Sequence, residues 1–354
     1  MKKLFLCLSS VFVLAGPWGP ALAAFQDPLD VPALQGARPD RATLIQVIRT
    51  PGNRLVAVGR YGVVLLSDDA GQTWQQGRVP VSTDLVAASF PSARTGWAVG
   101  HGGIVLKTED GGSAWTVQMD GRKAAVLLKS HYEQRLAAGD PEAQRGLEDA
   151  LRFQEEGPGR PFLDVWFEDE ASGYVVGAYN LILRTRDGGK SWTFLGDQVD
   201  NPGALHINAI QKIGDALFLA GEQGKLWRLD PATDKFALVP TPYAGSWFGL
   251  VGTSRAVVAF GLRGNVWRSG DGGASWQKID SGVESTVTAG TRLDDGRIIL
   301  ATSGGATIVS SDEGMSFTPF KVERPMPFFG VAALAGKKGI ALAGSRGVRI
   351  NPAP

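Results

Sequence analysis

The side chains that could bind a ligand or carry out chemistry recur in one kind of short glycine turn. Each turn follows an apolar stretch, as in residues 57–62, and a second apolar stretch follows the turn. The turns carry arginines, tyrosines and other polar residues at their tips. Arginine and aromatic side chains suit a surface that binds a peptide or a polar ligand, because guanidinium groups pair with carboxylates and stack on aromatic rings. The candidate binding residues, in these turns and in the loops between repeats, are Arg60, Tyr61, His101, Tyr179, Asn180, His206, Glu222, Gln223, Tyr243, Trp247, Arg263 and Arg346.

A hydrolytic site would need a different set of residues. Glycoside hydrolases use a pair of carboxylates or, in sialidases, a tyrosine nucleophile. Glu222 is the only acidic residue in the glycine turns, and no Arg-Ile-Pro segment of the sialidase type precedes the first repeat. We therefore expect no enzymatic activity and no catalytic residues. A glycoside hydrolase of the sialidase or xyloglucanase type is the alternative.

Composition argues against metal, nucleotide and nucleic-acid binding. The three histidines, His101, His131 and His206, lie far apart in the sequence, and the glycine turns stand between strands rather than at the start of a helix. Removing Lys2 and Lys3 from the 36 basic residues leaves 34 against 35 acidic ones, which gives no field that would attract nucleic acid. We expect no cofactor and no metal.

A second motif, the Asp-box, describes a complete tight turn. Its order is Ser/Thr-x-Asp-x-Gly-x-Thr/Ser-Trp, in which the Asp accepts bonds from backbone amides, the Gly adopts positive φ and the Trp anchors the next strand. Four copies and a weaker fifth occur. Their residues, to which we assign a structural role, are Asp69, Gly71, Trp74, Asp110, Gly112, Trp115, Asp187, Gly189, Trp192, Asp271, Gly273, Trp276, Asp312, Gly314 and Phe317.

The glycine turns recur seven times with a period near 42 residues, broken by one longer interval. This is the length of a four-stranded propeller blade. We predict an all-β fold, a seven-bladed β-propeller of four-stranded antiparallel blades over residues 25–354. In the first blade the strands are expected at residues 44–49, 54–58 and 63–67 and from Trp74. The fourth repeat lacks the box glycine and should make a blade with another turn.

The longer interval, about residues 121–160, has a helical pattern. Val126, Leu128, Tyr132 and Leu136 fall on one helical face, Leu147 and Leu151 continue an apolar stripe, and Asp140 with Pro141 is typical of a helix start. We predict a helical hairpin inserted between blades 2 and 3. It is either a fixed cap on the propeller or a mobile lid.

The N-terminus has the order of a secretory signal peptide. Lys2 and Lys3 precede an apolar run, and small residues around Ala23 and Ala24 mark the cleavage site. We expect residues 1–24 to be removed and the protein to be exported to the periplasm. The only cysteine, Cys7, lies inside the apolar run, which argues against a lipid anchor.

The seventh repeat ends at its third strand. We predict that the segment from Phe25 to Leu34 supplies the missing outer strand of the last blade and so closes the ring. Within each blade, the Asp-boxes then lie on one face of the ring. The glycine turns and the loops between blades lie on the other, with their variable side chains pointing towards the mouth of the central channel.

The Asp-boxes, the glycine turns, seven repeats and a signal peptide resemble the photosystem II stability and assembly factor family, exported propellers of the bacterial-neuraminidase-repeat type. The resemblance covers nearly the whole mature chain and implies a non-enzymatic scaffold that binds membrane-protein subunits through an arginine-lined face. Arg60, Arg263 and Arg346 stand where they could form such a face. We expect a monomer without a membrane span, whose partner is a membrane or envelope protein.

Overall fold

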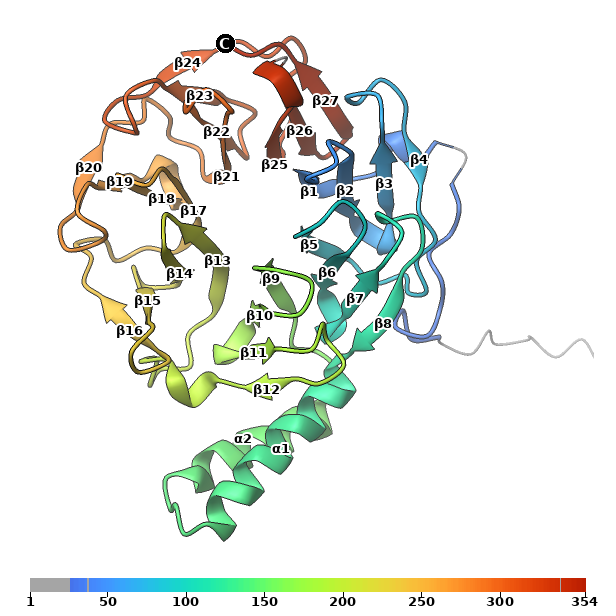
Figure 1. The fold of residues 1–354 in the computed structure, drawn as a ribbon, viewed down its shortest axis with the longest axis vertical. Helices are drawn as coiled ribbons and strands as arrows, with labels where there is room; N and C mark the ends of the chain where they lie inside the picture. The colour runs from blue at the N-terminus through green and yellow to red at the C-terminus, as the bar shows by residue number, and fades with distance from the viewer. Residues whose placement is uncertain (1–25, 37, 338) are drawn as a thin grey trace, which may run out of the picture.

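Seven antiparallel sheets stand around a central axis in the computed structural model, which describes residues 26–36, 38–337 and 339–354 (Figure 1). In the described part of the chain, six sheets have four strands and the last has three. Consecutive strands pair with one another, from the channel outwards. The predicted seven-bladed propeller is therefore confirmed. The predicted signal peptide lies outside the described residues.

The strands follow the repeat. Blade 1 contains β1 (Leu44–Arg49), β2 (Leu55–Gly59), β3 (Val64–Ser67) and β4 (Gln75–Gln76), as expected. The other blades contain β5 (Leu85–Ser89), β6 (Gly96–Gly100), β7 (Val105–Thr108) and β8 (Thr116–Met119); β9 (Phe162–Phe167), β10 (Gly173–Gly177), β11 (Ile182–Thr185) and β12 (Thr193–Phe194); β13 (Ile207–Ile213), β14 (Ala216–Gly221), β15 (Leu226–Asp230) and β16 (Lys235–Val239); β17 (Trp247–Gly252), β18 (Val257–Gly261), β19 (Val266–Ser269) and β20 (Gln277–Ile279); β21 (Val287–Arg292), β22 (Ile298–Thr302), β23 (Thr307–Ser310) and β24 (Thr318–Phe320); and β25 (Phe328–Ala333), β26 (Ile340–Gly344) and β27 (Gly347–Asn351).

The Asp-box carboxylates hold the turns between the third and fourth strands. Asp187 accepts bonds from the Ser191 N–H (2.9 Å), the Ser191 hydroxyl (2.6 Å) and the Thr185 hydroxyl (2.9 Å). These bonds lower the pKa of Asp187 to about 2. Asp69, Asp271 and Asp312 bond in the same way, and Asp110 lacks only the second hydroxyl because residue 114 is alanine. The predicted turn-forming role of the boxes agrees with this geometry.

The core lies between blades. Trp97 of β6 stacks on Phe167 of β9 with ring centroids 3.5 Å apart, and Trp192 meets Phe167 edge-on. The Asp-box motif predicted that each box tryptophan anchors the next strand in the core. Trp115 and Trp192 are buried, but Trp74 and Trp276 remain partly exposed. Burial of a box tryptophan therefore depends on what the neighbouring blade supplies.

The predicted closure of the ring is wrong. The described part of the N-terminal segment lies beside the link between blades 1 and 2 and forms no strand there: the Ala33 N–H bonds to the Val79 carbonyl (3.0 Å) and the Ser82 N–H to the Pro28 carbonyl (2.8 Å). The ring closes instead through packing of β1 against β25 and β26, whose apolar side chains share one core cluster. Side-chain burial between sheets thus replaces the expected backbone pairing.

The insertion is a helical hairpin of α1 (Gly121–Ala137) and α2 (Ala143–Glu156), as predicted, but it projects outward from the rim of the ring (Figure 1). Asp120 caps α1, and α2 begins two residues after the expected Pro141. Val126 and Leu151 are exposed rather than core residues, because Ala150 and Phe153 form the buried side of α2. The register of an apolar stripe was therefore misassigned.

One cluster fastens the hairpin to blade 3. The Asp197 carboxylate, in the loop after β12, lies 2.6 Å from His131 Nε2 and accepts a bond from the Tyr132 hydroxyl (3.1 Å). Arg135 also pairs with Asp197, and the rings of His131 and Tyr132 contact Phe194 of β12. These contacts tie the hairpin to blade 3 at the rim of the ring.

Replacing Trp192 by alanine should lower the free energy of unfolding by about 3 to 5 kcal/mol, the range for a buried tryptophan. Trp74→Ala should cost clearly less, about 1 to 3 kcal/mol, because its ring is partly exposed. Urea denaturation followed by circular dichroism measures both. Equal losses in the two variants would show that exposure does not govern the contribution of a box tryptophan.

Candidate functional site

The glycine turns bring the ends of the first and second strands of each blade very close together. A Cβ atom on Gly100 would lie 2.0 Å from the Asp84 carbonyl oxygen, and one on Gly177 would lie 2.2 Å from that of Pro161. These distances are far below a normal contact, so only glycine fits at positions 100 and 177; blade 6 has Thr302 at the corresponding position. The repeat of the first glycine therefore follows from packing.

The tips of two of these turns carry tyrosines in a left-handed backbone conformation. Tyr61 has φ of 57° and Tyr179 has φ of 54°, and their side chains are 70% and 56% exposed. Bulky residues rarely adopt positive φ, and glycine stands at the same position of the second blade's turn, at Gly102. The two exposed rings thus occupy positions where backbone conformation alone favours glycine.

A cavity of about 1120 Å³ runs along the axis between the innermost strands. Each innermost strand carries a register shift near its start, which leaves one bulged residue between two paired ones. The bulged residues all lie at the glycine-turn end of their strands. They are Ile45, Val86, Leu163, Asn208, Phe248, Thr288 and Phe329.

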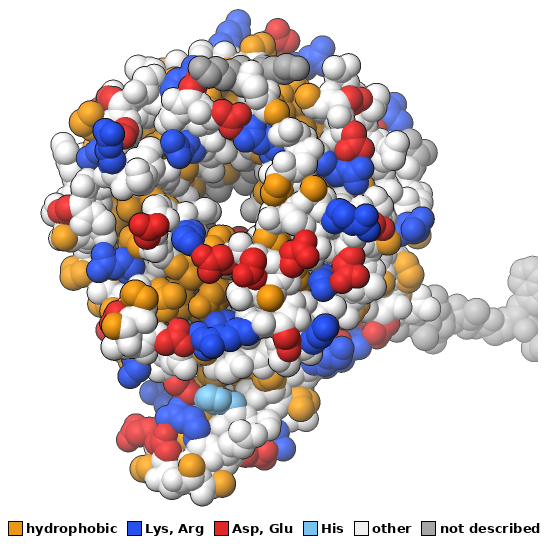
Figure 2. All heavy atoms as spheres, viewed as in Figure 1, with side chains coloured by type: hydrophobic (Ala, Val, Ile, Leu, Met, Phe, Trp, Pro, Cys, Tyr) orange, Lys and Arg blue, Asp and Glu red, His pale blue; other side chains and the backbone are white. Residues whose placement is uncertain are grey.

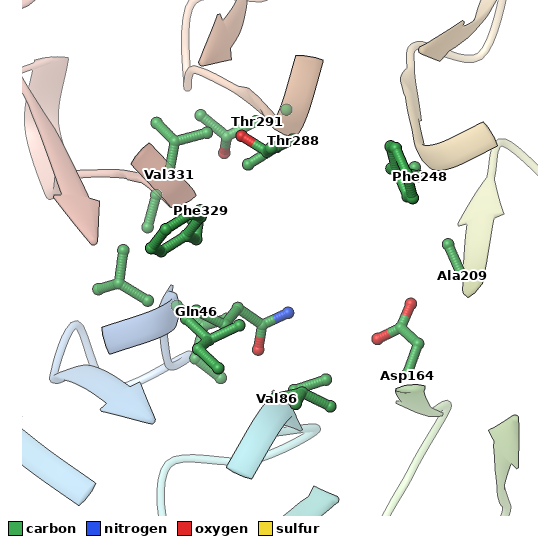
Figure 3. Close-up of a pocket in the computed structure, with 18 of the residues that line it drawn as sticks. Gln46, Val86, Asp164, Ala209, Phe248, Thr288, Thr291, Phe329 and Val331 are labelled. Atoms are coloured by element: carbon green, nitrogen blue, oxygen red, sulfur yellow. The ribbon is translucent and has the colours of Figure 1, made fainter. Parts of the chain in front are cut away.

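All seven bulged residues line the cavity, and Val86, Phe248, Thr288 and Phe329 are seen around it in Figure 3. We call these seven residues the bulge ring, and five of them are apolar. Sequence analysis missed the bulge ring. One sequence pattern could have indicated it: two aromatic residues followed by glycine, at Trp247-Phe248-Gly249 and again at Phe328-Phe329-Gly330.

The structure separates the sequence-predicted binding residues into four groups. Arg60 lines the central cavity, as expected. Tyr61, His101, Tyr179, Gln223, Arg263 and Arg346 are exposed at turn tips on the same face but do not line the cavity. Trp247 is fully buried, because it pairs with Gly261 and packs between blades while its neighbour Phe248 bulges into the channel. The prediction for Trp247 is therefore wrong.

The remaining predicted residues bond within the face. The Asn180 side chain donates to the Gly196 carbonyl (2.9 Å) and accepts from Asn201 (3.0 Å), which orders the adjoining loop. Tyr243 packs against Trp247 with ring centroids 4.4 Å apart. Both side chains thus support the loops between blades.

A second aromatic and charged group surrounds Tyr179. The His206 ring meets it edge-on at 4.7 Å, and the Arg160 guanidinium lies 5.2 Å from its centroid. Glu222 accepts a bond from the His206 N–H (3.0 Å). Arg160, which sequence analysis did not select, also pairs with Asp149 of α2 (2.7 Å) and so ties the base of the hairpin to this group.

The arginines of the face differ in their surroundings. Arg60 lies 3.6 Å from Asp84 in an exposed pair, which holds it at the edge of the cavity. Arg263 and Arg346 are exposed at turn tips. Figure 2 shows the open centre of the ring from one side, with charged side chains of both signs around it. Neither sign dominates that view.

One carboxylate faces the channel. Asp164 follows the bulge of β9 and is partly exposed to the cavity (Figure 3). It accepts bonds from the Ile210 and Val165 N–H groups, both 2.9 Å, so it links blade 3 to blade 4. Desolvation by the channel wall outweighs these bonds and raises the pKa of Asp164 to about 7.

Within the described part of the chain, no group of three or more histidine, cysteine or acidic side chains is placed to hold a metal ion. A bilayer-spanning helix is also not found among residues 26–36, 38–337 and 339–354.

Asp164→Asn should change how stability depends on pH. A carboxyl whose pKa rises from near 4 in the unfolded chain to about 7 in the folded one weakens folding as pH rises through that window. The stability of the asparagine variant relative to the wild type should therefore increase between pH 5 and pH 8, by on the order of 1 kcal/mol. Thermal denaturation at both pH values measures it. A difference that stays constant with pH would contradict the raised pKa.

Comparisons with known proteins agree with this architecture. Residues 154–324 match the family model described as photosynthesis system II assembly factor YCF48. A curated relative, the photosystem II assembly lipoprotein Ycf48 of Synechococcus sp. (strain CC9902), is 26% identical over 147 residues, which are 40% of this chain and 44% of that protein. The match thus spans less than half of that relative's length.

Solved structures show the same fold over most of the chain. YCF48 bound to a D1 peptide superposes with a TM-score of 0.64 and 16% identity, covering 92% of this chain and 99% of the other. YCF48 from Cyanidioschyzon merolae gives 0.61 and 16%, covering 91% and 98%. The WD40 propeller domain of Doa1 gives 0.62 at 12% identity, covering 91% and 96%, so the fold alone extends beyond one family. The sequence matches distinguish the YCF48 relatives from other propellers of the same fold. They confirm the predicted resemblance to the photosystem II assembly factor family.

Proposed function

We propose that this protein is a non-catalytic scaffold that binds a segment of a membrane or envelope protein on its glycine-turn face and acts as an assembly or stability factor. The glycine-turn face comprises the seven glycine turns, the loops between blades and the bulge ring. The site is assembled from one short turn of each blade, so a rigid ring presents it. The rest of the proposal concerns what this face can recognise.

The bulge ring below the arginines is the observation that carries the proposal. Phe248 is partly exposed at the cavity opening, and Val86 and Phe329 line the same opening (Figure 3). Arg60 stands at its edge. Apolar surface inside a charged rim is the usual arrangement of a protein-binding site, because burial supplies affinity and the rim supplies specificity. An extended segment with apolar and acidic side chains fits this combination.

The left-handed tyrosines support the same face. Tyr61 and Tyr179 hold a conformation that costs roughly 1 kcal/mol or more for a side chain with a Cβ atom, and both rings remain largely exposed. Exposed aromatic rings are enriched in protein interfaces. A binding role accounts for tyrosine at positions where stability alone favours glycine.

The relatives point in the same direction. The matched family and the curated relative are named as photosystem II assembly factors, and one structure of similar fold is titled as bound to a D1 peptide. We infer for this chain the same kind of task, the binding of a membrane-protein segment. The relative is named a lipoprotein, which supports export of this chain as well. We propose a periplasmic location for it.

A glycoside hydrolase is less well supported. Glu222 bonds to the His206 backbone, and the channel carboxylate Asp164 bonds to two backbone N–H groups. Each acid thus has a structural partner, and they stand on different strands and turns rather than as the acid pair that glycosidic cleavage uses. We therefore assign no catalytic role to either residue.

The triple variant Arg60→Ala, Arg263→Ala, Arg346→Ala should lower recovery of the partner roughly tenfold or more in a pull-down from detergent-solubilised envelope. Each exposed arginine contact is worth about 1 kcal/mol, and three together exceed a tenfold effect. The melting temperature should stay close to that of the wild type, because all three side chains are exposed.

The matched control removes three exposed arginines from the opposite face. Arg94 and Arg255 lie in turns between first and second strands, and Arg186 lies in an Asp-box. The variant Arg94→Ala, Arg186→Ala, Arg255→Ala has the same net charge as the test variant and should keep wild-type recovery. Loss of the partner in the control but not in the test variant would show that the other face binds it.

A further inference from the structure

The third strand of blade 7 forms the outer edge of its sheet. In each of the other blades, a fourth strand covers the corresponding edge. In blades 1 to 6 a fourth strand pairs with the third, whereas the sheet of blade 7 ends at β27. Among the described residues, the strand pairing of Val348–Asn351 is to β26 alone. An uncovered edge is a template for another strand, because its backbone groups are free to pair.

In the described ranges 26–36, 38–337 and 339–354, the segments near the two termini contact only part of this edge. The N-terminal segment reaches only its beginning, where the Gly347 N–H bonds to the Ala42 carbonyl (2.9 Å). After Asn351 the chain turns towards blade 6: Ala353 packs against that core cluster, and Arg297 bonds to the Pro354 carbonyl. No described residue of either segment pairs with β27 as a strand.

The surface beside the edge is apolar. Ile350 is 42% exposed, and Val348 lies partly buried with Ala70 and Trp74 of the first Asp-box. At the next junction, the chain after β4 bonds across to the second Asp-box through Arg78, and Trp115 there is buried. Trp74 stays partly exposed at the junction that lacks such a covering segment.

The chain's own outer strands define what fits the edge. Met119, Val239 and Ile279 are the buried last residues of their strands, and they pair with Val105, Leu226 and Val266 at the start of the third strand. Val348 occupies the same register position in blade 7, because it pairs with Ala343 as Val105 pairs with Val99. A ligand strand would therefore place a large apolar residue opposite Val348.

We propose that the outer edge of β27 is a second binding site, which takes an extended segment of the partner protein as the fourth strand of blade 7. The site is continuous with the glycine-turn face, because β27 begins directly after the turn that carries Ser345 and Arg346. Strand addition supplies affinity through backbone bonds and selects an apolar side chain at one position. The identity of the partner rests on the proposed function, but the edge itself does not.

A peptide that copies residues 233–241 is a suitable probe, since β16 within it is an outer strand of five residues and β27 has the same length. The labelled peptide should bind the mature protein in a fluorescence polarisation assay. Hydrogen exchange should slow at residues 348–351 when it binds. A peptide with Val239→Asp, which removes the apolar residue expected opposite Val348, should bind at least tenfold more weakly.

Ile350→Lys should weaken binding of the probe at least tenfold, because a charge on an edge strand opposes strand addition. Leu238→Lys is the matched control: Leu238 is 37% exposed on the outer strand of a complete blade, and its variant should bind within twofold of the wild type. Exchange in the wild-type protein tests the site even if Ile350→Lys does not fold.

Several results would overturn the proposal. They are no binding of the probe, protection of residues other than 348–351, or an unchanged affinity in Ile350→Lys. Sedimentation that shows a dimer lost in Ile350→Lys would assign the edge to a second copy of the chain instead. The Arg60, Arg263 and Arg346 triple variant should still bind this probe, so failure here is distinguishable from failure of the glycine-turn face.

Discussion

The Asp-box carboxylate is the interaction on which the rest of the ring depends. Asp69, Asp187, Asp271 and Asp312 each accept bonds from a backbone N–H and from two hydroxyls of their own turn. The turn is therefore complete without a ligand, and its tryptophan or phenylalanine is directed into the space between blades. The Asp-box turns repeat the same bonds, whereas the turns on the opposite face differ in sequence at their tips. The fourth blade shows that one box can be replaced, since Asp230 bonds to Ala232 and Thr233 in a different turn and the blade keeps four strands.

The glycine-turn face is organised by backbone geometry. The first glycine of a turn allows close approach of the first strand of the blade. The bulge near the start of that strand turns one side chain into the channel. Polar channel residues then join neighbouring blades, as when the Asn208 side chain donates to the Trp247 carbonyl (2.9 Å) and Thr288 donates to the Phe328 carbonyl (2.7 Å). The bulge ring is thus rigid, and its apolar side chains are displayed without being free to collapse.

The sequence predicted the features that are local and repeated. Asp-boxes, glycine turns and a regular period led to seven blades and to the correct first three strands of blade 1, and a helical pattern led to the hairpin. The closure of the ring was not predictable in this way, because it depends on which distant apolar faces pack best. Trp247 and Phe248 illustrate the limit within the site: alternation alone cannot show which of two neighbouring aromatics is buried, and the bulge decides it.

Site-specific photo-cross-linking tests the central claim, that the glycine-turn face holds the partner. Benzoylphenylalanine would replace Tyr61 or Tyr179 on that face, and Met315, which is 58% exposed in an Asp-box, on the other. Irradiation with solubilised envelope should give the same cross-linked membrane protein from both tyrosine positions and none from position 315. A cross-link from position 315 alone would contradict the account.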